Sequence, residues 1–360
     1  MTSANRSDNI LTELLTGLPS PDSEARDMVT ARAGDVLRPA GALARLDSLA
    51  AWLAGWQCTG TPRAERPHVI VFAADHGVAA ENVSVYPATA TAAMVDAIRC
   101  GSATVSALAR QIGATVELVD VGVGTPTGNI RYEDAMSSRA FNEAVQAGVA
   151  AVERCGTTAD DTPKPTDDTP TNTTTIQKCK ADLLVVGEMG IANSTAAAAV
   201  TAAVLGGDAD DWVGPGTGVT GTALDRKRRV VEDALDRVGR VSPLEALRRL
   251  GGYELAAMAG AVLTARHCAL PVVLDGFIAT ASAVPLAVAQ PGSLDHCIAG
   301  HCSAEPGHRR MLEALQLDPI LQLDMRLGEG SGALLAVPII QMAAAAVVDV
   351  ATFEEWGLER

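Results

Sequence analysis

The segment HVIVFAADHG, residues 68–77, decides the fold class of this 360-residue chain. The run from 68 to 74 is almost entirely apolar, which is typical of a strand covered on both faces, as in a parallel sheet. The run ends in Asp75-His76-Gly77, where polar side chains and a glycine indicate a turn. The segment therefore predicts a buried parallel strand whose following turn carries polar side chains.

Three more segments repeat this pattern of an apolar run that ends in a polar or glycine-containing turn. They are residues 115–121, which end in Asp120 and Gly122, 182–186, which lead to Glu188, and 271–274, which lead to Asp275. Helices are predicted between the strands, at residues 91–110, 195–205, 226–238 and 253–267. Strands that alternate with helices predict an α/β fold with a parallel sheet. Because ligands bind such sheets at the carboxyl ends of the strands, we expect Asp75, His76, Glu188 and Asp275 to border a site.

The chain outside this pattern is predicted to be helical towards both ends. Apolar residues recur every three or four positions between 43 and 56, as on one face of a helix. The apolar stretch 333–348 contains Pro338 and Gln341 and is short for a membrane span, so a buried helix is predicted there. Residues 156–180 are rich in Thr, Asp and Pro and nearly free of apolar side chains, which predicts an exposed insertion.

The charge and the cysteines limit the classes of function. The net charge of −15 repels phosphate backbones and anionic lipid, so neither nucleic acid nor a membrane surface is an expected partner. An anionic substrate would need a locally positive site or one lined by backbone N–H groups. The seven cysteines are scattered and form no C-x-x-C, which predicts reduced thiols. The first residues show no signal-peptide pattern, so we expect a cytoplasmic protein.

Two glycine-rich turns have the composition of phosphate-binding loops. Residues 187–195, GEMGIANST, follow a predicted strand and open a helix, where backbone N–H groups can hold an anion. Residues 214–218, GPGTG, precede Lys227 on the next predicted helix. Either turn alone is more often an ordinary strand-to-helix connection, but the two together favour phosphate binding. The turn 122–128 has the wrong spacing for a dinucleotide fingerprint, and no phosphate-binding P-loop motif occurs, so a dehydrogenase and a P-loop ATPase are unsupported.

A fourth turn, RLGEGSG at 326–332, places Glu329 between two glycines. A carboxylate held against apolar walls gains a raised pKa and can act as a general base near neutral pH. A turn glutamate that faces water or caps the following helix fits the same local sequence equally well. We also note His296, Cys297, His301, Cys302, Glu305 and His308, which are metal-ligand types within a short stretch. Their spacing differs from the usual zinc pairs, so we predict no metal and no other cofactor.

Through these and other motifs, the chain resembles the nicotinate-nucleotide–dimethylbenzimidazole phosphoribosyltransferase family. The resemblance spans nearly the whole chain except residues 156–180. The matching segments include AADHGVAAENVSVYP (73–87), GEMGIANSTAAAAV (187–200), GPGTGV (214–219) with Lys227, LGGYELAAMAGAV (250–262), VLDGFIATASA (273–283), HCSAEPGH (301–308), RLGEGSGA (326–333) and ATFEEWGL (351–358). GEMGI-x-N and RLGEG-x-GA are the most specific of these strings.

The resemblance implies a Rossmann-like parallel sheet flanked by helices, with a smaller helical domain from the chain ends, in a homodimer. We expect the small domain at 1–65 together with 340–360, and the catalytic domain at 66–339. The implied reaction transfers the phosphoribosyl group of nicotinate mononucleotide to 5,6-dimethylbenzimidazole, giving α-ribazole 5′-phosphate and nicotinate in cobalamin lower-ligand assembly. The family's general base corresponds to Glu329. Glu188 would stabilise positive charge that develops on the ribose, and Lys227 would assist at the phosphate.

The remaining implied site residues fall into two groups. The nucleotide phosphate and ribose would be held by Gly190, Asn193, Ser194, Gly216, Thr217 and Gly218, with Ser303 near the nicotinate carboxylate or the phosphate. The pocket for the benzimidazole base would be lined by Ser84, Tyr86, Met94 and Leu327. This chain departs from the family pattern at Ala192-Asn193-Ser194-Thr195, where G-N-T-T is common, and at Ala93, where Gln is frequent. The change at Ala93 leaves the preferred base open, and a nucleotide-binding module without transferase activity is the alternative function.

Overall fold

The computed structural model describes residues 9–155 and 180–359. Within these residues, five parallel strands form one sheet in the order β2-β1-β3-β4-β5. The strands are β1 (Pro67–Ala74), β2 (Thr115–Gly122), β3 (Leu183–Met189), β4 (Val272–Leu274) and β5 (Cys297–Ala299). The α/β fold with a parallel sheet is confirmed. The sequence did not predict β5, because this three-residue strand is too short to stand out as an apolar run.

The alternation of side chains along β1 explains why its sequence is continuously apolar. Val69 and Val71 pack on one face of the sheet, and Ile70 and Phe72 pack on the other. Both faces are covered by helices, so every residue from Val69 to Ala74 is buried. In the register, Phe72 of β1 lies opposite Glu188 of β3. The polar residues that follow the strands therefore gather at one edge of the sheet.

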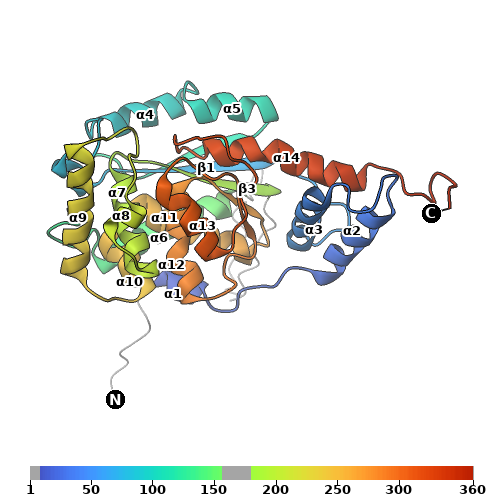
Figure 1. Ribbon diagram of the computed structural model, residues 1–360, viewed down its shortest axis with the longest axis horizontal. Coiled ribbons are helices and arrows are strands. Elements are labelled where there is room, and N and C mark those ends of the chain that lie inside the picture. Colours follow the sequence, from blue (N-terminus) through green and yellow to red (C-terminus); the bar gives the residue numbers. More distant parts are fainter. Residues whose placement is uncertain (1–8, 156–179, 360) are drawn as a thin grey trace, which may run out of the picture.

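Helices cover the two faces of the sheet in separate layers (Figure 1). One layer contains α4 (Ala90–Arg99), α5 (Thr104–Ile112) and α14 (Ser331–Val348). The other contains α6 (Ser138–Arg154), α7 (Asn193–Leu205), α11 (Tyr253–His267) and α12 (Phe277–Ala289). The connections hold η1 (Gly77–Glu81), α8 (Ala209–Trp212), α9 (Thr222–Val238), α10 (Pro243–Leu250) and α13 (Pro306–Leu315). The single helix predicted at 91–110 was wrong: the chain turns at Gly101, whose φ is +76°, and α4 and α5 are separate.

Glycines and alanines allow α6 and α11 to pack very closely. A Cβ atom added to Gly148 would lie 1.9 Å from the carbonyl oxygen of Ala257, and one added to Gly260 would lie 2.4 Å from that of Val145. These are backbone contacts that rotation of a side chain cannot relieve. The chain can therefore form a dense core although it has few aromatic residues, because small side chains bring the helices together.

Substitution of Gly148 by Ala will destabilise the fold, by about 1–3 kcal/mol as for an overpacked core. The added methyl group must push α6 away from the backbone of α11. Denaturant unfolding of the two proteins measures the difference. Gly34→Ala is the matched control, because Gly34 lies in α2 with open space around it. That change should stabilise the helix by up to about 1 kcal/mol. Equal stability of Gly148→Ala and wild type would contradict the packing argument.

The chain ends build a small helical unit beside the sheet (Figure 1). It consists of α2 (Ser23–Asp35), α3 (Ala44–Gln57) and the carboxyl half of α14, which meet at Val29, Ala33, Ala50, Ala54 and Val347. By contrast, α1 (Ile10–Leu14) packs with the α/β body through Leu11, and Leu14 accepts a hydrogen bond from His267. The domain division at residue 65 stays a prediction, with α1 on the other side of it in space.

Among the described helices, α14 alone is long and apolar enough to meet the criteria for a membrane span. Its side chains Leu334, Val337 and Ile340 are buried in the core that covers one face of the sheet. The prediction of a helix with buried residues at 333–348 is therefore confirmed. The predicted insertion at 156–180 lies outside the described residues, apart from Lys180.

Candidate active site

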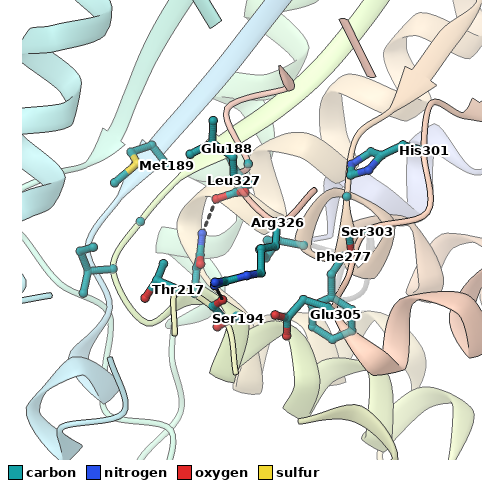
Figure 2. A pocket seen from close by; sticks show the side chains of 17 residues that line it. Glu188, Met189, Ser194, Thr217, Phe277, His301, Ser303, Glu305, Arg326 and Leu327 are labelled. Atoms are coloured by element: carbon teal, nitrogen blue, oxygen red, sulfur yellow. Dashed lines mark hydrogen bonds between the residues drawn. The ribbon is translucent and has the colours of Figure 1, made fainter. Parts of the chain in front are cut away.

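A cavity opens at the carboxyl ends of β3, β4 and β5 (Figure 2). Five segments line it: residues within 188–194 at the end of β3 and the start of α7, 216–217 before α9, 276–278 after β4, residues within 301–305 after β5, and the turn 326–328. The first residues of α7 and α12 and the residue before α13 belong to this lining. Helix N-termini carry partial positive charge and unpaired N–H groups, so the cavity is suited to an anionic ligand despite the acidic chain.

Glu188 projects from the end of β3 into this cavity. Its carboxylate accepts a hydrogen bond from Nδ2 of Asn193, drawn as the dashed line in Figure 2. Burial raises the pKa of Glu188 well above its usual value, and the nearby carboxylates of Glu254 and Asp275 raise it further. Positive charge in the cavity would lower this raised pKa.

The turn that carries Glu329 is held tightly against β3. A Cβ atom on Gly187 would lie 2.3 Å from the Gly330 nitrogen, so only glycine fits at this point of the strand. Gly328, Glu329 and Gly330 all have positive φ, at +91°, +62° and +79°. For Glu329 this left-handed conformation costs roughly 1–2 kcal/mol. Asp275 compensates by accepting hydrogen bonds from the nitrogens of Gly330 at 3.1 Å and Ala333 at 2.8 Å.

Glu329 is buried, with 2% of its surface exposed. Its Oε2 accepts a hydrogen bond of 3.2 Å from the backbone nitrogen of Val105 in the first turn of α5. Burial raises the pKa of Glu329, and the Val105 N–H opposes this shift. The alternative in which Glu329 faces water or caps α14 is excluded. The neighbouring Gly328 lines the cavity, and a Cβ there would lie 2.5 Å from Oε1 of Glu188, so the turn covers Glu188 directly.

Lys227 reaches from α9 to the two glycine-rich turns. Its Nζ donates hydrogen bonds of 2.9 Å to Oγ of Ser194 and 2.9 Å to the carbonyl of Gly214. Burial lowers the pKa of Lys227 to about 8, with the negative charge of Glu305 acting in the opposite direction. A small second cavity joins Lys227 to Ser84, Gly190, Asn193, Gly216 and Thr217. A buried ammonium beside helix and turn N–H groups is the strongest anion-binding feature of this site.

Ser303 is oriented by a neutral histidine. Nδ1 of His308 lies 2.8 Å from the nitrogen of Ser303, which donates to it, and 2.9 Å from Oγ of Ser303. Nε2 of His308 then carries the proton and donates to Oγ1 of Thr280 at 3.0 Å. Burial lowers the pKa of His308 to about 3, which agrees with a neutral ring.

The structure also shows how the metal-ligand types between 296 and 308 are used. Nε2 of His296 donates to the carbonyl of Val262 at 2.8 Å, and both ring nitrogens of His308 are hydrogen-bonded. Elsewhere in the described chain, ligand atoms of His68, Glu117 and Cys155 lie within 4.8 Å of one another. That group is at the opposite edge of the sheet, around the start of β1 and β2, and is separate from the cavity.

Most of the residues singled out from the sequence meet in space. The main cavity is lined by Glu188, Gly190, Asn193, Ser194, Gly216, Thr217, Ser303 and Leu327. Ser84 and Lys227 line the small cavity beside it. Four others line neither cavity. They are Glu329, which is buried in the turn beside Glu188, Tyr86, which is 55% exposed, Met94 on α4, and Gly218, whose nitrogen donates to the carbonyl of Pro215. Asp75 and His76 border a separate open cavity at the ends of β1 and β2.

The sequence did not single out several lining residues as substrate contacts, and four of them carry ring or charged side chains. Phe277, His301, Glu305 and Arg326 line the main cavity. Phe277 follows the predicted strand 271–274, so its place after the strand was a usable signal. His301 and Glu305 follow β5, which was not predicted, and their position could not be derived. Arg326 donates to the carbonyl of Gly216 at 2.8 Å, a contact between distant turns that only the fold reveals.

Fold and site together define an α/β protein with a cavity suited to an anionic ligand at the carboxyl edge of a parallel sheet. A family model described as a phosphoribosyltransferase matches residues 18–162 and 171–358. The chain belongs to the nicotinate-nucleotide–dimethylbenzimidazole phosphoribosyltransferase family.

Relatives and solved structures are similar over nearly the whole chain. A relative of that name from Cereibacter sphaeroides is 45% identical over 95% of this chain and 94% of its own. One from Brucella anthropi is 42% identical over 96% of this chain and 95% of its own. The crystal structure of CobT from Thermus thermophilus has a TM-score of 0.84 and 40% identity, and the match covers 94% of this chain and 99% of that one.

Proposed function

We propose that this chain transfers the phosphoribosyl group of nicotinate mononucleotide to 5,6-dimethylbenzimidazole, in the assembly of the cobalamin lower ligand. The products are α-ribazole 5′-phosphate and nicotinate. Full-length relatives with this activity in their names support the assignment. The observation that carries it in the structure is the cavity lined by Glu188 and by the 190–194 and 216–217 turns. Buried Lys227 lines the small cavity beside these turns, and Glu329 is buried in the turn that packs against β3.

The chemistry follows from where the charges lie. One nitrogen of the base forms a bond to C1′ of the ribose, on the face opposite to nicotinate, so the β-linkage becomes an α-linkage. The C1′–N bond to nicotinate breaks, and its electron pair neutralises the pyridinium ring. The second nitrogen of the base loses its proton to Glu329. Glu188 stabilises the positive charge that grows on the ribose during this displacement.

The phosphate is placed at the start of α7 and on the 214–218 turn. Ser194, Gly216, Thr217 and Lys227 supply hydroxyl, backbone and ammonium donors there, and Gly190 and Asn193 approach the ribose. Ser303, oriented by His308, is placed beside the nicotinate carboxylate or the phosphate. Gly218 would contribute through the conformation of the turn, since its φ is +128°.

The base pocket is placed at Ser84, Tyr86, Met94 and Leu327. Tyr86 and Leu327 are 55% and 52% exposed, so in a single chain this pocket is open to water. An aromatic base and a general base both need a dry environment. We therefore propose a homodimer in which a second subunit covers these residues. The scattered cysteines support a reducing, cytoplasmic setting.

Raising the pH will lower kcat/KM for nicotinate mononucleotide, because Lys227 loses its positive charge. The ammonium loses its proton as pH rises through about 8, so the free enzyme loses the positive charge that attracts phosphate. We expect kcat/KM for the nucleotide to fall by up to about tenfold per pH unit above this pKa. A Lys227→Met variant should have a low kcat/KM at all pH values. Its pH profile should lack this alkaline limb, the fall in kcat/KM above the pKa of Lys227. An alkaline limb of the same size in Lys227→Met would contradict the assignment.

Nicotinate release, measured with and without the base, tests the proposed function. Release that requires 5,6-dimethylbenzimidazole, with equimolar α-ribotide, is the expected result. Binding of the nucleotide without either product would instead indicate a nucleotide-binding module. A panel with other benzimidazoles, adenine and phenols then shows the base preference, to which Ala93 is relevant because it lies on α4 between Thr91 and Met94.

A further inference from the structure

Glu305 is a buried carboxylate in the substrate cavity for which the reaction described above has no use. It immediately precedes α13 as the N-cap residue, yet its side chain makes no capping hydrogen bond. Only 6% of its surface is exposed, and it lines the same cavity as Glu188 and Ser303. Neither Oε1 nor Oε2 has a hydrogen-bond partner among the residues that the structure describes. A buried carboxylate without partners is unfavourable and requires a compensating interaction.

The groups around Glu305 do not supply that compensation. Burial raises the pKa of Glu305, and the charge of Lys227 and the backbone of Gly216 only partly oppose this shift. Lys227 directs a hydrogen bond to Ser194 instead, and Arg326 donates to the Gly216 carbonyl. Figure 2 shows the Glu305 carboxylate turned towards Ser194 and Arg326, across the cavity rather than along α13. The missing donors must therefore come from what fills the cavity.

The chemistry of the nucleotide then leaves one partner. Nicotinate mononucleotide has three kinds of polar group outside its ring: a phosphate, a carboxylate and the two ribose hydroxyls. The first two are anionic acceptors and offer no hydrogen-bond donor to Glu305, while the phosphate charge is met by Lys227 and the turn N–H groups. The 2′- and 3′-hydroxyls are its only hydrogen-bond donors, and a vicinal diol can donate to both oxygens of one carboxylate. With the phosphate at Lys227 and C1′ near Glu188, the diol is the remaining part of the same sugar.

We propose that Glu305 binds the ribose 2′- and 3′-hydroxyls of the phosphoribosyl donor and makes the enzyme selective for ribosyl over deoxyribosyl nucleotides. This inference rests on the proposed function, since it assumes that a phosphoribosyl donor occupies the cavity. In this proposal Glu305 makes a specificity-determining contact. It lies on the same loop after β5 as His301 and Ser303, which also line the cavity.

A cycle between enzyme and substrate variants tests the contact. The four combinations are wild type and Glu305→Gln, each with nicotinate mononucleotide and with its 2′-deoxy or 3′-deoxy analogue. We expect wild type to lose roughly ten- to hundredfold in nucleotide affinity when either the hydroxyl or the carboxylate is removed, as for a hydrogen bond to a charged group. The second removal should then cost little. Because affinity is read by calorimetry, the greater intrinsic reactivity of deoxyribosyl donors does not enter.

Glu313→Gln is the matched control, because Glu313 is an exposed carboxylate on the same helix, and it should bind both donors like wild type. If the losses from Glu305→Gln and from each deoxy analogue simply multiply, the hydroxyls do not contact Glu305 and the inference is overturned. Unchanged affinity of Glu305→Gln for the full nucleotide has the same meaning. Thermal melting checks that Glu305→Gln is folded. Failure of wild type to bind or turn over the nucleotide would instead count against the proposed function.

Discussion

Replacement of Glu329 by Gln will lower kcat for α-ribotide formation at least about a hundredfold, as expected when a general base is removed. Gln keeps the shape of the side chain and can still accept the hydrogen bond from Val105, but it cannot take the proton of the base. Nucleotide affinity should stay near the wild-type value, because the phosphate contacts lie on other turns. Single-turnover kinetics with calorimetry of nucleotide binding separates the two effects.

The pH profile gives an independent check on the same residue. Burial raises the pKa of Glu329, and only the ionised carboxylate can accept a proton. Activity should therefore fall as the pH drops through this raised pKa, and Glu329→Gln should lack that acidic limb. Glu133→Gln, a change of an exposed carboxylate, serves as the control and should leave the profile intact. Turnover of Glu329→Gln close to wild type would remove Glu329 from the role of general base.

The sheet could be predicted because its strands leave a strong local signal. β1 is apolar on both faces, and the sequence predicted it to within one residue of its bounds. β5 could not be found, because three residues carry no periodicity and the strand is defined only by its pairing with β4. The prediction joined α4 and α5 into one helix across Gly101, because a single glycine does not reveal that the chain turns there.

The candidate site was predictable where glycine marks a close approach of the backbone. Gly187 and Gly328 pack the turn of Glu329 onto Glu188, and both glycines are visible in the sequence. The sequence does not show that Asp275 ties this turn to β4, or that Glu305 lies unpaired across the cavity. Those relations join residues far apart in the chain, so they depend on the order of the strands.

The Ala192 departure from the family pattern also has a local physical meaning. Ala192 precedes α7 with a φ of +75°, a conformation that glycine adopts freely. The chain therefore keeps the turn geometry before α7 with a residue that disfavours it. Asn193, which follows, still bonds to Glu188, so the arrangement of the site is retained.

Glu188→Gln is expected to reduce kcat by roughly a hundred- to a thousandfold, comparable to the loss of a preorganised electrostatic group. In the free enzyme, burial and the nearby carboxylates raise the pKa of Glu188, which favours the protonated form. The positive pyridinium ring and the growing charge on the ribose reverse this preference and draw the proton off. Gln offers a dipole instead of a full negative charge, so the transition state loses more than the ground state. Nicotinate release under saturating base and nucleotide measures the effect.

The free energy of unfolding gives a second measurement on Glu188→Gln. The substitution lowers activity, but it should raise stability at alkaline pH. The pKa of Glu188 is higher in the folded than in the unfolded chain, so its protonated form stabilises the fold most below the unfolded pKa. That contribution is lost as the pH rises through the raised, folded pKa. Glu188→Gln cannot ionise, so its stability relative to wild type should increase with pH. A variant that is less active and yet more stable at alkaline pH would show a carboxylate retained for catalysis at the expense of the fold. A variant that is unstable at every pH would show that Glu188 is needed for packing instead.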